Sequence, residues 1–152
     1  MRLNAVKYSP DGYKAMLGLQ AVVDNSRLDH KLQELVKIRA SQINGCAYCL
    51  DMHTKDARAI GETEMRIYVL PAWRETDFYS PKERAALAWC EALTLLPESG
   101  APDYVYKEVE SQFKPEEITE LTMAIVVINS WNRLSVGFRS EAGKYVSDRK
   151  PG

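Results

Sequence analysis

The amino-acid sequence predicts an all-α protein that forms a single domain over residues 1–152. Apolar residues recur at steps of three and four along most of the chain, which is the spacing of an amphipathic helix. Residues typical of helix starts and ends flank these stretches, and only the segment "MRIYVL" would also fit a strand. A chain of 152 residues is long enough to bury one good core.

The first part of the chain predicts three helices, of which the second and third form a hairpin. Residues 9–26 and 27–45 each carry apolar residues at helical spacing, and Asn44-Gly45 then supplies the left-handed stop that is common after a helix. A third helix is predicted from Cys46 to Ile60. Because the connection is so short, we expect the second and third helices to form an antiparallel hairpin.

The second half of the chain predicts further helices. A short helix is expected within residues 61–73, ended by Pro71. The next begins at a capping box, with Ser80 as N-cap, Pro81 in the first helical position and Glu83 three residues after the serine. Residues 96–103 are predicted to be the clearest loop. The remaining predictions are helices over residues 101–113 and 114–140, the last with a bend near Asn132 or Gly137.

Charge and hydropathy exclude several kinds of partner. The 20 Lys+Arg nearly balance the 21 Asp+Glu and are scattered, so no basic surface for nucleic acid or a membrane stands out. No apolar run approaches the roughly 18 to 20 residues of a membrane span. The first ten residues, "MRLNAVKYSP", lack the apolar core of a signal peptide. We therefore expect a cytoplasmic protein without nucleic-acid or membrane partners.

The three cysteines differ in their surroundings. An odd number in a chain without an export signal argues against a structural disulfide framework. Cys90 lies in an apolar helix and is interpreted as a buried thiol that packs like a hydrophobic side chain. Cys46 and Cys49 form a C-x-x-C motif at a helix start, and His53 follows one turn later. All three motif residues fall on the face predicted to pack into the protein.

Three interpretations of this motif remain open. The helix start and the nearby histidine favour a reactive thiolate with a proton-handling partner, although burial opposes ionisation of a thiol. In the second interpretation Cys46 and Cys49 are buried thiols without a chemical role, and His53 is a core histidine whose hydrogen bonds are satisfied. As a metal site it offers three ligands, but the other histidine, His30, lies one helix earlier and a second C-x-x-C is absent. We expect neither a metal nor another cofactor.

A fourth residue, Glu34, is identified by a resemblance. From periodicity alone Glu34 is a solvated glutamate. Yet Glu34, Cys46, Cys49 and His53 match the E-x(11)-C-x-x-C-x(3)-H signature, which resembles the alkylhydroperoxidase D (AhpD) family of the carboxymuconolactone decarboxylase superfamily. The segments "LVKIRASQINGCAYCLDMH", "SPKERAALAWCEALT" and "AIVVINSWNRLSVGFR" are similar to that superfamily, and the likeness covers roughly residues 10 to 140.

The resemblance implies an all-helical homo-oligomer (dimer, trimer or hexamer) with thiol peroxidase chemistry. It assigns attack on a hydroperoxide to Cys49, proton donation and disulfide closure to Cys46, and a proton relay to Glu34 and His53. A dithiol, thioredoxin-like or lipoyl donor would restore the thiols. Tyr48 stands where better studied members carry a histidine, which implies a shorter relay or a different substrate. The decarboxylase branch lacks the C-x-x-C, so decarboxylation is not expected.

Further hypotheses concern the alternative function and the last helix. The main alternative to an enzyme is a non-catalytic thiol sensor or an adaptor that relays electrons. Asn129 and Asn132 fall on the apolar side of the last helix, where they line the pocket or, as we expect more strongly, make structural hydrogen bonds. The apolar run "LTMAIVVI" and the aromatic residues Trp73 and Trp131, taken as exposed, predict self-association.

Overall fold

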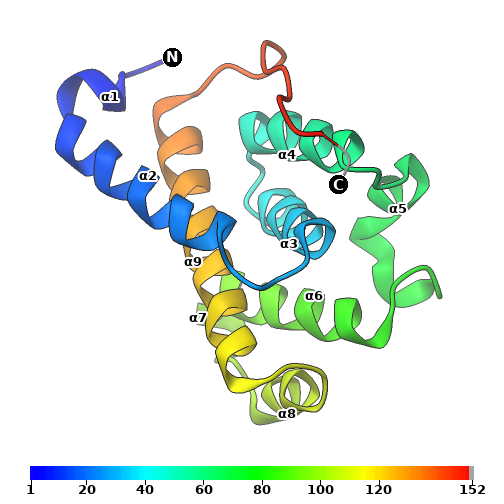
Figure 1. Cartoon of the computed structure of the whole chain (residues 1–152). Helices are drawn as coiled ribbons and strands as arrows, with labels where there is room; N and C mark the ends of the chain where they lie inside the picture. Colours follow the sequence, from blue (N-terminus) through cyan, green and yellow to red (C-terminus); the bar gives the residue numbers. More distant parts are fainter. Residues whose placement is uncertain (151–152) are drawn as a thin grey trace.

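The computed structural model describes residues 1–150, and within them it contains helices and connecting segments but no strand. The all-α prediction is therefore confirmed. None of the described helices has both the length and the apolar character needed to cross a membrane. The elements shown in Figure 1 are α1 (Ala5–Tyr8), α2 (Pro10–Asp24), α3 (His30–Ile43), α4 (Ala47–Ala59), α5 (Glu64–Tyr68), η1 (Leu70–Glu75), α6 (Pro81–Thr94), α7 (Leu96–Ser99), α8 (Asp103–Gln112) and α9 (Pro115–Phe138).

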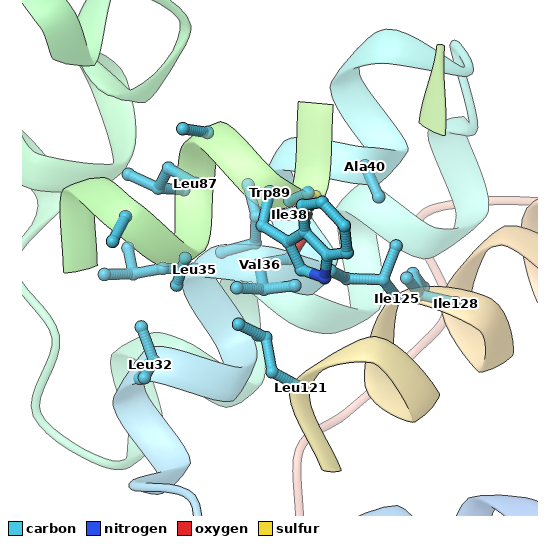
Figure 2. Close-up of a cluster of buried hydrophobic side chains, with 14 of the residues drawn as sticks. Leu32, Leu35, Val36, Ile38, Ala40, Leu87, Trp89, Leu121, Ile125 and Ile128 are labelled. Atoms are coloured by element: carbon cyan, nitrogen blue, oxygen red, sulfur yellow. Dashed lines mark hydrogen bonds between the residues drawn. The ribbon is translucent and has the colours of Figure 1, made fainter. Parts of the chain in front are cut away.

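Helix α3 lies at the centre of the core. Figure 2 shows its apolar side chains between those of α6 on one side and those of α9 on the other. Leu35, Val36 and Ile38 are completely buried, although they point in different directions around the helix. Since α4 also packs against α3, little of this helix faces solvent. Any polar residue of α3 on these covered faces must therefore find a partner inside the protein.

The turn between α3 and α4 sets the position of the thiols. Gly45 adopts a positive φ of 64°, which glycine allows without steric cost. The backbone N–H of Cys46 then donates to the carbonyl of Ser41, so the chain reverses within three residues. Helix α4 starts immediately afterwards with Cys46 as its N-cap. As a result α4 packs back on α3 and brings its inner face against that helix.

Several predicted boundaries in the second half differ from the structure. Pro71 does not end a helix, because α5 already stops at Tyr68 and Pro71 opens the 3-10 turn η1, where its missing N–H costs nothing. The predicted loop contains α7, with Pro97 in its first turn and Gly100 as its left-handed C-cap. Helix α9 runs without interruption to Phe138, past both positions where a bend was expected. The capping box at the start of α6 is confirmed.

Trp73 is not the exposed aromatic residue that was expected. Its side chain is only 4% exposed, and its indole N–H donates to Glu91 at 2.9 Å. The guanidinium groups of Arg74 and Arg84 lie 4.1 and 5.1 Å from its ring centroid, a distance at which a cation is attracted to an aromatic face. Trp131 is half-buried. The expectation that Trp73 is exposed was therefore wrong, and Trp73 gives no support to self-association.

The segment after α9 is irregular but firmly attached to α4. Figure 1 shows it running alongside that helix. The backbone N–H of Gly143 donates to Asp51 at 2.8 Å, and Lys55 donates to the carbonyl of Tyr145 at 2.8 Å. The hydroxyl of Tyr145 donates to Asp56 at 2.9 Å. This C-terminal segment therefore forms one wall of the region in front of α4.

Candidate thiol active site

The structure brings the four residues of the signature to one place. Cys46, Cys49 and His53 lie on the inner face of α4, and Glu34 faces them from α3. All four are buried, with exposed fractions of 1%, 3%, 9% and 4% respectively. Glu34 is therefore not a solvated residue. The prediction from periodicity assumes that a helix has one buried apolar face and one exposed face. Helix α3 is covered on several sides, so a residue outside its apolar stripe can also be buried.

Glu34 and His53 form a buried hydrogen bond. The His53 Nδ1 and Glu34 Oε2 atoms lie 2.8 Å apart. Burial by itself would raise the pKa of Glu34, but the hydrogen bond and charge of His53, together with Lys37, lower it from 4.5 to about 2. The carboxylate is therefore ionised at neutral pH and can only accept, so Nδ1 carries the proton. This leaves Nε2 as the nitrogen of His53 that can take up or return a proton.

The two motif thiols share a hydrogen bond at the start of α4. The backbone N–H of Cys49 donates to Cys46 Sγ at 3.3 Å. A hydrogen bond from the Cys49 thiol lowers the pKa of Cys46 to about 7, against the effect of burial. The same hydrogen bond, together with burial, raises the pKa of the Cys49 thiol. Cys46 is therefore the thiol of the pair that ionises first, with the proton of Cys49 directed at its sulfur.

A cavity of about 740 Å³ opens onto this site. Cys49 lines it, together with Glu34 and His53, whereas Cys46 is not among its lining residues. The Cys49 sulfur is therefore the one that a molecule in the cavity meets first. Aromatic and apolar side chains form much of the remaining wall, and the Tyr13 and Trp131 rings make an edge-to-face contact with centroids 5.3 Å apart. These side chains are Tyr13, Leu17, Tyr48, Met52 and Trp131.

Asn129 and Asn132 do not line this cavity; they connect α9 to the turn before α4. The side-chain amide of Asn44 donates to both, at 3.0 and 2.9 Å. Asn132 in turn donates to the Ser41 hydroxyl at 3.0 Å, and Asn129 donates to Thr94 at 3.0 Å. These contacts are structural hydrogen bonds, and Asn132 also hydrogen-bonds the thiols of Cys46 and Cys49. This network supports the turn that carries Cys46.

Sequence reasoning missed several groups of the site. Lys37, Asp56 and Tyr145 line the cavity, and the first two are almost fully buried. The pattern of α3 contained one usable signal, because a lysine three residues after a glutamate can pair with it on the same helix face. No sequence pattern links Tyr145 to Asp56, since 89 residues separate them. That contact depends on how the C-terminal segment returns to α4.

One group of side chains offers metal ligands. Single oxygen or nitrogen atoms of Glu34, His53 and Asp56 all lie within 4.8 Å of one another. Each of these groups already has a protein partner: Glu34 contacts His53 and Lys37, and Asp56 accepts from Tyr145. The geometry therefore serves a hydrogen-bond network. The expectation that the protein uses no metal stays a prediction.

Comparison with known proteins places the chain in a family. A model of the carboxymuconolactone decarboxylase family matches residues 10–92. Uncharacterized protein YdfG of Bacillus subtilis (strain 168) is 45% identical over 141 residues, which make up 93% of this chain and 96% of YdfG. The structure of a protein of unknown function from Agrobacterium tumefaciens, suggested to be the antioxidant defence protein AhpD, is 44% identical. It superposes with a TM-score of 0.91 over 95% of this chain and 99% of its own.

A more distant structure shares the fold. The debrominase Bmp8 superposes with a TM-score of 0.81 at 21% identity, over 91% of this chain and 75% of its own. Fold and thiol site together define an all-helical protein of the carboxymuconolactone decarboxylase family, and the chain belongs to that family. Within it the chain is AhpD-like, as the resemblance of its signature predicted.

Proposed function

We propose that this protein is a thiol peroxidase that reduces organic hydroperoxides and is returned to the dithiol state by a dithiol, thioredoxin-like or lipoyl donor. The observation that carries the proposal is the buried Glu34–His53 hydrogen bond beside a thiol pair of which one member lines the cavity. A peroxide bond is broken by a sulfur nucleophile when the departing oxygen receives a proton. The site contains a group for each task.

The proposed reaction begins with proton transfer within the thiol pair. The Cys46 thiolate accepts the proton of Cys49, and the Cys49 sulfur attacks the terminal peroxide oxygen. The O–O bond breaks, Cys49 becomes a sulfenic acid, and the Cys46 thiol protonates the alkoxide to give an alcohol. The Cys46 thiolate then attacks the sulfenic sulfur, closing the disulfide. The hydroxide released takes a proton that His53 has gained from solvent, and water leaves.

A donor completes the cycle. A dithiol donor attacks the Cys46–Cys49 disulfide, is itself oxidised to a disulfide, and leaves both protein thiols reduced. Overall, the donor loses two electrons and two protons, and the hydroperoxide becomes an alcohol and water. A C-x-x-C pair on the first turn of a helix suits this exchange, because both sulfurs can form one disulfide without moving an element of the fold.

The walls of the cavity favour a hydroperoxide with an apolar, ring-sized substituent. Tyr13, Tyr48 and Trp131 offer faces and edges on which such a group is removed from water. Hydrogen peroxide has no apolar part to place there. Tyr48, which stands where a histidine occurs in better studied relatives, adds an aromatic surface next to Cys49.

Steady-state assays test the proposed function. Purified protein with a dithiol should consume cumene hydroperoxide with a kcat/KM about tenfold or more above that for hydrogen peroxide. Trp131→Ala should reduce the first value much more than the second. A protein that forms the disulfide once with peroxide but does not turn over with any dithiol would instead be a thiol sensor or an electron-relay adaptor.

We also propose that the protein forms a homo-oligomer. Large apolar side chains are exposed on α1 and α2, and an apolar groove of about 650 Å³ lies between these helices and α9. The residues concerned include Leu3, Val6, Tyr8, Leu17 and Val22. Sedimentation at micromolar concentration should show a dimer, trimer or hexamer, and a monomer alone would contradict the proposal.

A further inference from the structure

Lys37 is a buried cation beside the proposed proton relay. Only 3% of the residue is exposed, and lysine is almost never buried to this extent unless it is paired. Its Nζ atom donates to Glu34 Oε1 at 3.0 Å and lies 3.7 Å from Asp24 Oδ1 of helix α2. Glu34 thus has a different partner on each carboxylate oxygen, Lys37 on Oε1 and His53 on Oε2.

We propose that Lys37 is a positioning residue that holds the Glu34 carboxylate ionised and aimed at His53. The inference rests on the proposed function, in which His53 handles a proton at Nε2. An ionised Glu34 can only accept, so His53 keeps its proton on Nδ1. If Glu34 were protonated, it would donate to Nδ1 and His53 would carry its proton on Nε2. The imidazole would then have no site for the proton it must take up.

Two neighbours stabilise the ionised Glu34 carboxylate: His53, which has the larger effect, and Lys37, which contacts Oε1. Glu34 is faced by Lys37 from its own helix and by His53 and Asp56 from α4. Asp56 is a nearby acid and cannot help Glu34 to ionise. Other charged or titratable groups around the cavity are Asp24 of α2, His30 of α3, and Tyr145, Asp148, Arg149 and Lys150 of the C-terminal segment.

Of those groups, Asp24 is the one that contacts Lys37. Asp24 lies 3.7 Å from Lys37 and also 3.7 Å from Arg149. Asp24 therefore has a second cation and competes only partly with Glu34 for the lysine. The 3.0 Å contact to Glu34 is a direct hydrogen bond, whereas 3.7 Å is too long for one. The geometry thus directs an N–H of the Lys37 ammonium group at Glu34, with Asp24 on the other side of that group.

The test compares Lys37→Met with wild type by two measurements. Carbon NMR of the Glu34 carboxylate, labelled at Cδ, should show its pKa rise from about 2, because burial remains and Lys37, one of the two partners that lower it, is lost. The acid limb of cumene hydroperoxide turnover, measured as kcat/KM against pH, should move to higher pH by the same shift that the NMR titration gives for the Glu34 carboxyl.

Three variants control this comparison. Lys37→Arg keeps the charge and should restore both the carboxylate titration and the pH profile. Lys82→Met removes a lysine of α6 that pairs with Glu117 at 2.7 Å and does not line the cavity, and it should change neither measurement. If Lys37→Met does not fold, as judged by circular dichroism, Lys37→Met with Asp24→Asn removes both charges of the pair and should show the same rise in the Glu34 pKa.

The two proposals fail in different ways. If Glu34 titrates as in wild type after Lys37 is replaced in a folded variant, the role of Lys37 is wrong even if the enzyme is active. The same holds if the pKa rises but the turnover profile of an active variant is unchanged. If wild type does not turn over any hydroperoxide, the proposed function fails, and the NMR titration still decides whether Lys37 holds Glu34 ionised.

Discussion

Cys46 and Cys90 have almost no solvent exposure, yet their chemical environments are opposite. Cys46 is 1% exposed and Cys90 is completely buried. Burial raises the pKa of Cys90 to about 12, and its thiol donates weakly to the carbonyl of Val36 at 3.4 Å. The pKa of Cys46 is instead lowered to about 7, because its sulfur accepts from the side chain and the backbone of Cys49.

The difference lies in whether the sulfur accepts or donates. Cys90 sits in the middle of α6, where the backbone N–H groups are already bonded within the helix. Cys46 is an N-cap, so it meets N–H groups that have no helical partner and the positive end of the helix dipole. Position at a helix start and a shallower burial therefore together separate the reactive thiol of Cys46 from the inert thiol of Cys90.

The largest expected effect comes from removing the sulfur that lines the cavity. Cys49→Ser should abolish peroxide consumption, because no other motif sulfur contacts the cavity. Cys46→Ser should stop turnover but leave about one sulfenic acid per chain, trapped at Cys49 and countable with a dimedone-type reagent. Sulfenic acid trapped at Cys46 in the Cys49→Ser protein would reverse these roles, as the lower pKa of Cys46 alone would suggest.

A smaller effect is expected at the carboxylate of the relay. Glu34→Gln keeps the size of the side chain and removes its charge, so His53 loses the acceptor that fixes its tautomer. Hydroperoxide kcat/KM should fall by about 10² or more, on the scale of general acid–base catalysis. Lys82→Gln, on α6 and outside the cavity, serves as the control and should change little. Full activity in Glu34→Gln would leave His53 and Tyr48 as the relay.

The contrast between the thiols can be measured directly by alkylation with iodoacetamide. Only a thiolate reacts, so the rate rises with pH until the thiol is fully ionised. Alkylation of the Cys46–Cys49 pair should rise with a midpoint near pH 7, following Cys46, while native Cys90 stays unmodified up to at least pH 9. Mass mapping identifies the modified residue. After mild oxidation it should also show a Cys46–Cys49 disulfide with Cys90 reduced.

The fold was predictable where local signals are strong. Helical spacing, the capping box at Ser80 and the Asn44-Gly45 stop all depend on neighbours within a few residues, and each marks a boundary close to the observed one. The short helical turn α7 and the start of η1 at Pro71 were missed. In both places a proline can open a helical turn as readily as it can end one, and only the packing decides between these outcomes.

The site was predictable only through its signature. Periodicity placed Cys46, Cys49 and His53 on the inner face of α4, but it placed Glu34 in solvent. That reasoning assumes one covered face per helix, whereas α3 is covered by α4, α6 and α9. For the same reason the burial of Lys37 was not predicted. The hydrogen bond from Tyr145 to Asp56 could not be predicted from the sequence either, because it depends on the path of the whole C-terminal segment.

The smallest expected effect belongs to Cys90. Cys90→Ala removes one buried sulfur from the core and leaves a small gap, so unfolding in urea should show a loss of about 1 kcal/mol in stability. The Val36 carbonyl loses only a weak thiol donor at 3.4 Å. Since Cys90 lines none of the cavity at Cys49, hydroperoxide turnover and the alkylation midpoint of Cys46 should match wild type within twofold. A loss of turnover in a folded Cys90→Ala protein would mean that the inert thiol takes part in electron transfer, and the distinction between the two cysteine environments would no longer describe the chemistry.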